Sequence, residues 1–127
     1  MTMVFAYYNL RRKLFSVKAL EGSHKGLVIA HEPIVEMSNC TFKVSQAGRK
    51  RVLATRRKNV HAGIQGHLIG YPSRAITLEK ALEGHGYAFN IARYNPYKYD
   101  TFVDEDGDPV LQAKNVVLTA NYVLFRD

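Results

Sequence analysis

The residues best suited to do chemistry in this 127-residue chain are cations, and most of them lie in one short stretch. The run RKRVLATRRKNVH, residues 49–61, contains six basic side chains in ten consecutive positions and no acidic one: Arg49, Lys50, Arg51, Arg56, Arg57 and Lys58. Fixed positive charge concentrated in this way attracts phosphates and other anions. The stretch therefore predicts a polyanionic or phosphorylated partner, without saying which one.

The positive charge of the whole chain is confined to the surroundings of this stretch. No Asp or Glu occurs between Met37 and Leu78, whereas eight Lys or Arg do, so this window carries +8. The remaining ten basic and eleven acidic residues carry −1, which gives the net charge of +7. A basic surface is thus expected at one place in the fold.

A second candidate is the segment Arg93-Tyr94-Asn95-Pro96-Tyr97-Lys98-Tyr99, in which three tyrosines alternate with two bases and an amide. Aromatic rings stack on nucleobases, guanidinium groups bind phosphates, and an Asn side chain can donate to and accept from a base edge. These groups are typical of a nucleotide pocket. The alternative is structural, because Tyr-Asn-Pro-Tyr is also a turn with packed aromatics. Likewise, a helix dipole would favour bases in the last turn of a helix without any ligand.

Other chemistries find little support in the sequence. The acidic turn over residues 104–109 lacks the ligand spacing of a calcium loop, and a solvated turn is predicted there. The five histidines have no i,i+4 pair and one cysteine to combine with, so no metal site is expected. Neither a phosphate-binding P-loop nor a nucleophile elbow is present. Only His61 or His67 could act as a base near the cations, so we expect neither an enzyme nor a cofactor.

These residues must be positioned by a sheet with one main helix. Alternation of apolar and polar residues predicts strands over 7–10, 14–20, 27–31, 35–44, 60–70, 87–94, 99–103 and 116–125. Ser45 is a suitable N-cap and Asn59 a suitable stop for a helix over about 45–58, and a second short helix is allowed over about 73–83. The alternation shifts near Ser38 and Asn39, which predicts a β-bulge.

Length and composition predict a single α+β domain over residues 1–127, with an antiparallel sheet. The composition, 46% hydrophobic and 23% charged, is typical of a soluble globular protein, and no apolar run is long enough to span a membrane. A single cysteine, Cys40, suits the cytosol and is expected to be a buried structural thiol. Three glycines at 63, 66 and 70 in one predicted strand indicate a bend or a close approach.

The runs AGRKRVLATRRKNVHAGIQGHL, residues 47–68, and RYNPYKYDTFVDEDGDPV, residues 93–110, resemble a group of small phage and prophage proteins. This group includes the anti-Thoeris sponge proteins, which sequester immune signalling nucleotides. The resemblance implies a non-enzymatic protein that forms dimers or larger homo-oligomers in the cytoplasm of an infected bacterial host. The implied ligand is an intact cyclic ADP-ribose derivative, with cyclic oligonucleotides at a second site in some members.

The resemblance also implies a set of ligand-binding residues. Arg56, Arg57 and Lys58 would bind phosphate, and an aromatic residue with Arg93 and Asn95 would hold the base or ribose. The full set predicted is Arg56, Arg57, Lys58, Asn59, His61, Phe89, Arg93, Asn95, Tyr97, Lys98 and His24, with Tyr94, Tyr97 or Phe102 as alternatives to Phe89 for stacking. A small basic DNA- or RNA-binding phage protein is the alternative function, and an enzyme using His61 or His67 comes third.

Overall fold

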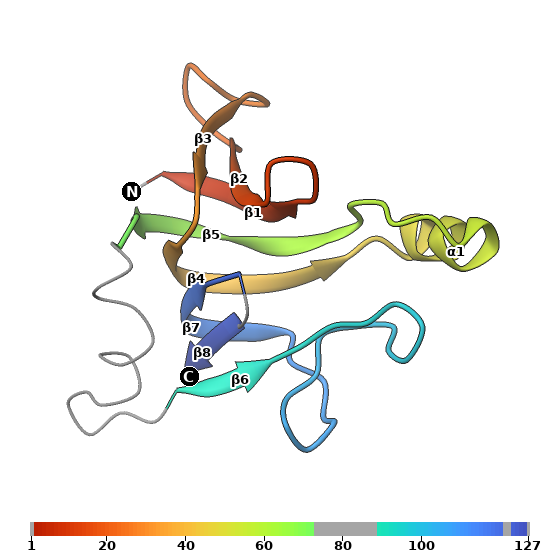
Figure 1. Cartoon of the computed structure of the whole chain (residues 1–127). Coiled ribbons are helices and arrows are strands. Elements are labelled where there is room, and N and C mark those ends of the chain that lie inside the picture. Colours follow the sequence, from red (N-terminus) through yellow and green to blue (C-terminus); the bar gives the residue numbers. More distant parts are fainter. Residues whose placement is uncertain (1, 73–88, 121–122, 127) are drawn as a thin grey trace.

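A computed structural model describes residues 2–72, 89–120 and 123–126, and it confirms the predicted α+β class. Its framework is an eight-stranded antiparallel sheet with strand order β3-β2-β1-β5-β4-β7-β8-β6 and one helix, α1 (Figure 1). The elements are β1 (Met3–Asn9), β2 (Leu14–Ala19), β3 (Val28–Glu32), β4 (Val35–Val44), α1 (Gln46–Thr55), β5 (Ala62–Gly70), β6 (Asn90–Ala92), β7 (Gln112–Leu118) and β8 (Val123–Arg126).

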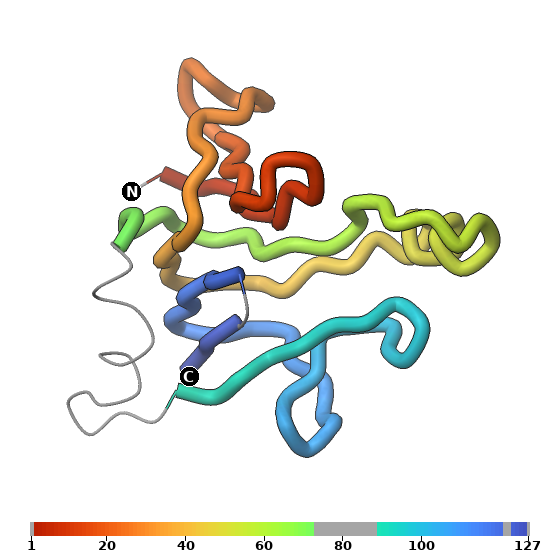
Figure 2. The backbone as a smooth tube through the Cα atoms, viewed as in Figure 1, coloured from red at the N-terminus to blue at the C-terminus, as the bar shows by residue number. Residues whose placement is uncertain are grey.

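The sheet is curled, so strands from its two halves share one hydrophobic core. Val4 and Ala6 of β1 belong to the same buried cluster as Met37 of β4 and Ala92 of the edge strand β6. A smaller cluster of Ile34, Val117 and Leu124 lies apart from it. As the tube in Figure 2 shows, α1, the loop that follows it and the segment after β6 extend from the same end of the sheet. That end carries the basic stretch over 49–61 and the tyrosine-rich segment over 93–99.

The predicted bulge in β4 is confirmed at Asn39. This residue has φ 49°, and the pairing of β4 with β5 shifts between Ser38 and Thr41. The extra residue keeps Cys40 on the buried side with Met37. Because the bulge reverses the parity of every residue after it, Thr41 lies on the face opposite to Met37.

Two glycines of β5 allow neighbouring strands to approach closely, as the sequence predicted. A Cβ on Gly63 would lie 2.6 Å from the Ala6 carbonyl oxygen and 2.5 Å from the Phe5 ring. A Cβ on Gly66 would lie 2.9 Å from the Ser38 carbonyl oxygen, beside the bulge. Gly70, by contrast, has open space around it.

Helix α1 begins as predicted but ends early. The Ser45 Oγ accepts a 3.1 Å hydrogen bond from the Gly48 N–H, which confirms the N-cap. The helix ends at Thr55 because Arg56 adopts a left-handed conformation, φ 58°, while its N–H bonds to the Val52 carbonyl. The predicted end at residue 58 is therefore wrong. The bases at 56–58 lie in the loop after α1, so a last-turn helix dipole does not account for them.

The first strand, expected over 7–10, begins earlier as β1 (Met3–Asn9), and the remaining differences concern the second half of the chain. Within the described part of the strand expected over 87–94, residues 89–94, the strand is β6 alone, and the one expected over 99–103 is reduced to isolated bridges of Val103 with Arg93 and Pro109. The strand expected over 116–125 is interrupted and forms parts of β7 and β8. The short helix allowed over 73–83 lies outside the described residues. No helix in the described ranges has the length and apolarity to cross a membrane.

We predict that Gly63→Ala destabilises the fold by about 1–3 kcal/mol, since the added methyl group would overlap a backbone oxygen that is held in the β1–β5 pairing. Urea unfolding measures this change. Gly70→Ala, in the same strand but with no atom within 4 Å, is the matched control and should change stability by less than about 0.5 kcal/mol. Equal effects of the two substitutions would contradict the close approach at Gly63.

Candidate ligand-binding cleft

A cleft of about 480 Å³ opens where β1, the α1–β5 loop and the segment after β6 meet. Its lining consists of Tyr8, Leu10, Val52, Lys58, Asn59, Val60, His61, Ala62, Tyr94, Asn95, Pro96 and Tyr97. The fold thus joins the basic stretch and the tyrosine-rich segment, which the sequence separates by more than thirty residues. Apolar side chains and tyrosine rings form most of this lining, with one ammonium group and two amides among them.

The N-terminal end of helix α1 packs directly against His61, one of the residues that line the cleft. Gly48 faces His61 so closely that a Cβ on Gly48 would lie 2.5 Å from the His61 Cβ. The Ser45 N–H also donates a 2.7 Å hydrogen bond to the His61 carbonyl oxygen. The start of the helix therefore fixes the backbone and side chain of His61.

Two side chains of α1 bind the loop that follows Tyr94. The Arg49 Nε donates to the carbonyl oxygens of Pro96 at 3.1 Å and Tyr99 at 3.0 Å, and the Gln46 Nε2 donates to that of Asp100 at 2.7 Å. Arg49 is half-buried by these contacts. Its charge is used to hold the loop, so Arg49 is a positioning residue and differs in role from the exposed bases beside it.

His61 and Tyr94 form a hydrogen-bonded pair inside the cleft. The His61 Nδ1 lies 2.8 Å from the Asn59 carbonyl oxygen, which can only accept, so Nδ1 carries a proton. The His61 Nε2 lies 2.7 Å from the Tyr94 hydroxyl and, in the neutral ring, accepts a hydrogen bond from it. Burial raises the pKa of Tyr94, which the Arg49 charge partly opposes and Asp100 reinforces. Both ring nitrogens of His61 are engaged, which argues against a free general base.

Five of the residues predicted for the site line the cleft: Lys58, Asn59, His61, Asn95 and Tyr97. The Arg56 guanidinium lies 5.5 Å from the centre of the Tyr97 ring, at the rim. Arg57 and Lys98 are exposed on the two bordering loops but do not line the cleft. The Asn95 Oδ1 accepts from the Tyr97 N–H at 2.9 Å, so the amide nitrogen is the part of Asn95 left for a ligand.

Three other predicted residues are placed elsewhere. Phe89 packs against the smaller hydrophobic cluster, 5.5 Å below the Arg126 guanidinium, and cannot stack on a ligand in the cleft. Arg93 faces a neighbouring hollow and its Nη2 donates to the Glu105 carbonyl oxygen at 3.4 Å. His24 is exposed in the turn between β2 and β3. Local composition could not distinguish these three residues from those that line the cleft, because the sheet register decides which side of the fold each residue faces.

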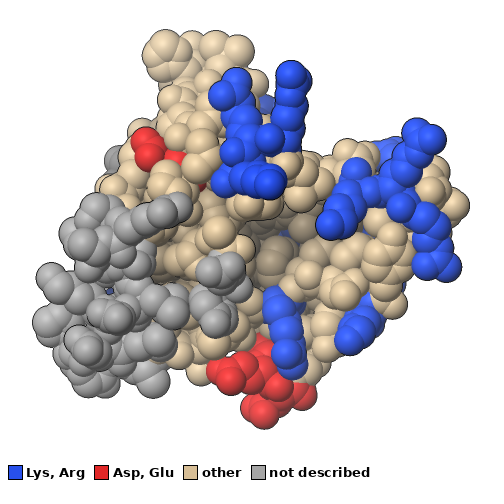
Figure 3. All heavy atoms as spheres, viewed as in Figure 1, with Lys and Arg blue, Asp and Glu red and all other residues tan. Residues whose placement is uncertain are grey.

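Sequence reasoning missed the contribution of the N-terminal hairpin. Tyr8 and Leu10 line the cleft, and the β1–β2 turn beside them carries the exposed bases Arg11, Arg12 and Lys13. In Figure 3 Lys and Arg side chains lie over this turn and around α1, on either side of a hollow, while acidic side chains lie farther away. The run Arg11-Arg12-Lys13 could have indicated from the sequence that this turn contributes to the site. Its position beside the cleft, however, depends on the pairing of β1 with β5.

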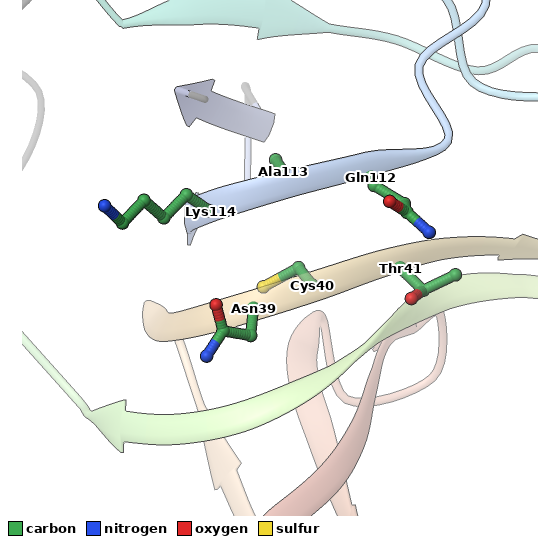
Figure 4. Close-up of a pocket in the computed structure, with 6 residues that line it drawn as sticks. All are labelled: Asn39, Cys40, Thr41, Gln112, Ala113 and Lys114. Carbon is green, nitrogen blue, oxygen red and sulfur yellow. The ribbon is translucent and has the colours of Figure 1, made fainter.

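A separate hollow of about 470 Å³ lies over the bulge, between β4 and β7 (Figure 4). Its lining is Asn39, Cys40, Thr41, Gln112, Ala113 and Lys114. Cys40 is 2% exposed, and burial raises its pKa to about 12. Such a thiol is not nucleophilic at neutral pH, which agrees with the predicted structural role.

The acidic turn has the local geometry of a tight loop. The Asp104 Oδ1 accepts from the N–H groups of Asp106 at 2.9 Å and Asp108 at 3.0 Å. The three carboxylates approach within 4.8 Å of one another, but Asp106 and Asp108 are exposed. The predicted turn is confirmed, and its hydrogen bonds explain why Asp residues occur there.

The fold and cleft define a small, mostly β protein with a basic, tyrosine-lined site. The chain belongs to a phage protein family, described as the Mycobacterium phage L5 gene 82 protein, which it matches over residues 1–126. It is similar to the gene 82 protein of Mycobacterium phage L5 itself, with 38% identity over 123 residues that cover 91% of this chain and 89% of that relative. No solved structure matches the chain significantly.

We predict that Arg49→Met destabilises the protein by about 1.5 kcal/mol, because two carbonyl oxygens lose a charged donor while the apolar part of the side chain is kept. Urea unfolding would measure the change. Arg51→Met removes the same charge from an exposed position of the same helix and should change stability little. If both variants lose equal stability, the loss comes from net charge and Arg49 does not hold the loop.

A second prediction concerns alkaline pH. The Cys40 pKa of about 12 in the folded protein exceeds the value of about 8.5 expected when unfolded. The folded state therefore keeps a proton that the unfolded chain releases, and this contribution to stability falls as pH rises from about 9 towards 12. The free energy of unfolding should fall less steeply over this range in Cys40→Ala than in the wild type. Parallel pH profiles would contradict the raised pKa.

Proposed function

We propose that the cleft binds a free nucleotide and releases it chemically unchanged, so that the protein sequesters its ligand. The observation that supports this most directly is the meeting of Lys58 and His61 with Tyr94, Asn95 and Tyr97 in one cleft. An ammonium group and exposed guanidinium groups at the rim suit phosphates, while tyrosine rings and an amide suit a base and ribose. Each kind of group needed for a nucleotide is therefore within one site.

Binding without reaction fits the chemistry of the lining. No Asp, Glu, Ser, Thr or Cys is among the described residues that line the cleft, and both His61 ring nitrogens are hydrogen-bonded. The Tyr94 hydroxyl and His61 Nε2 form a nucleophile–base pair in geometry, but burial raises the pKa of Tyr94, which makes its phenolate harder to form. Retaining an anion needs only fixed cations and stacking surfaces. We therefore favour a binding protein over an enzyme.

The biological role that we propose is immune evasion by a phage protein in the infected host cell. In this proposal the ligand is a cyclic ADP-ribose derivative or a cyclic oligonucleotide that would otherwise activate a host defence. A symmetric oligomer would bring basic clefts of two copies together, and each bound anion would reduce their repulsion. The family relationship supports the phage origin on which this role depends.

Binding of DNA or RNA is the second candidate, favoured by a separate observation. The basic surface extends beyond the cleft on both sides, through the exposed basic side chains of α1 and of Arg11, Arg12 and Lys13 (Figure 3). A polymer could follow such a surface, and its affinity would fall steeply with salt because each neutralised phosphate releases counterions. A single nucleotide would show a shallower salt dependence.

The deciding experiment is to incubate the protein with a panel of cyclic ADP-ribose isomers and cyclic oligonucleotides, wash it, denature it and identify the released compounds by mass. We predict recovery of an intact nucleotide. Lys58→Ala, which removes the ammonium group that lines the cleft, should reduce the recovered amount at least about tenfold, the loss expected for one charge-assisted contact.

Lys50→Ala is the matched control, since Lys50 is exposed on α1 and outside the cleft but the change in net charge is the same. Equal loss in both variants would indicate attraction by the overall field and not a defined cleft. Recovery of a cleaved product would favour an enzyme. Recovery of nothing, together with salt-sensitive binding of single- or double-stranded nucleic acid, would favour the second candidate.

A further inference from the structure

Besides the hollow over the bulge, a second hollow, of about 330 Å³, adjoins the cleft on the side of the curled sheet; it is the one that Arg93 faces. The two spaces share Tyr8, Ala62 and Tyr94 in their linings, so they are neighbouring compartments of one region. We call the second hollow the inner compartment. Beyond the shared residues, most of its lining comes from core strands: Ala6, Tyr7, Phe15, Gly63, Ile64, Ala92, Arg93, Phe102, Leu118, Thr119, Ala120 and Val123.

Two pairs of aromatic rings border the inner compartment. Tyr8 and Phe15 pack edge to face with ring centres 5.3 Å apart, and Tyr94 and Phe102 pack at a tilt with ring centres 5.3 Å apart. The first pair belongs to the N-terminal hairpin and the second to the segment after β6. A space lined by aromatic side chains suits a flat ring, since aromatic rings gain energy from stacked or edge-to-face contacts.

Charge distinguishes the two compartments. Lys58 lines the cleft, with exposed bases around its rim, whereas Arg93 is the charged side chain among the described residues of the inner compartment. The Arg93 Nη2 already donates to the Glu105 carbonyl oxygen. Phosphates are therefore favoured in the cleft, where Lys58 and the basic residues of the rim lie, and a mainly apolar group is favoured in the inner compartment, where apolar and aromatic side chains form most of the described lining.

We propose that the inner compartment is the recognition slot for the nucleobase of the ligand, with the phosphates held outside it in the cleft. This assignment rests on the proposed function and specifies how the site would select its ligand. The Tyr94 ring lies at the junction, and its hydroxyl is held by His61, so the ring is already positioned before a ligand arrives. Selectivity between nucleotides would then depend on the shape of the base.

The test compares adenosine diphosphate with inorganic pyrophosphate by calorimetry at one salt concentration. Both probes carry two linked phosphates, but only the first has a base. We expect the wild type to bind adenosine diphosphate at least about tenfold more tightly, because stacking one base on aromatic side chains contributes about that much or more. Similar affinity for the two probes would overturn the proposed slot.

Two variants narrow the inner compartment without altering Lys58. Ala120→Phe enlarges an exposed residue at its border, and Ala92→Leu enlarges a buried residue within it. Each should reduce the affinity for adenosine diphosphate to that for pyrophosphate, while pyrophosphate binding stays unchanged. Ala54→Phe makes the same kind of change on an exposed face of α1, outside both compartments, and should leave both affinities unchanged.

The outcomes separate this assignment from the function on which it rests. If Ala120→Phe folds normally and keeps the full affinity for adenosine diphosphate, the base does not enter the inner compartment, although a nucleotide-binding cleft is retained. Loss of binding in Lys58→Ala would then still support the cleft. If the wild type binds neither probe, the proposed slot is overturned, whereas the proposed function is contradicted only if no intact nucleotide is recovered from the cyclic panel.

Discussion

The cleft depends on how closely helix α1 approaches the strand and loop beside it. Gly48 has no side chain, which allows the helix to contact His61, and Arg49 reaches across to two carbonyl oxygens of the loop after Tyr94. Without these contacts the helix would have little to attach it, because Gly48 and Val52 are its buried residues. A helix with so small an apolar face is stabilised mainly by its tertiary contacts. The same contacts that place the helix therefore also form the site.

Electrostatics sets a second constraint on this end of the molecule. The segment from Met37 to Leu78, which contains no Asp or Glu, supplies the basic residues of α1 and of the loop after it. The β1–β2 turn adds three more basic residues beside the cleft. Arg49 is partly compensated by its carbonyl partners, and Arg56 by the face of Tyr97, but Arg57 and Lys58 make no ion pair with any described residue. Like charges at short range repel, and a bound anion lowers that cost. An anionic ligand of the proposed kind would therefore reduce a repulsion that the free protein carries.

Sequence reasoning predicted the fold class, the limits of β4, its bulge and the start of α1, because each has a local cause. Alternation of burial gives the strands, a left-handed Asn39 gives the bulge, and the Ser45 hydroxyl caps the helix. Sequence reasoning failed where the cause is a conformation or a contact that the local sequence does not reveal. The early end of α1 follows from a left-handed Arg56, a conformation that composition does not reveal, and the position of Phe89 depends on which face of the sheet its segment covers. The part played by Tyr8 could not be seen without the pairing of β1 with β5.

The curl of the sheet links the stability of the fold to the proposed selectivity of the site. Curling brings Ala6 and Ile64, from the middle of the sheet, opposite Ala92 and Val123, near its edge, and these small and medium side chains leave the inner compartment incompletely filled. Five of the described residues that line this space are aromatic, so an unfilled space leaves part of their ring surface without packed neighbours. A planar ligand that fills the space would recover those contacts. Because the recovered energy depends on the shape of the ligand, the proposed slot would add selection by the shape of the nucleobase to attraction by charge.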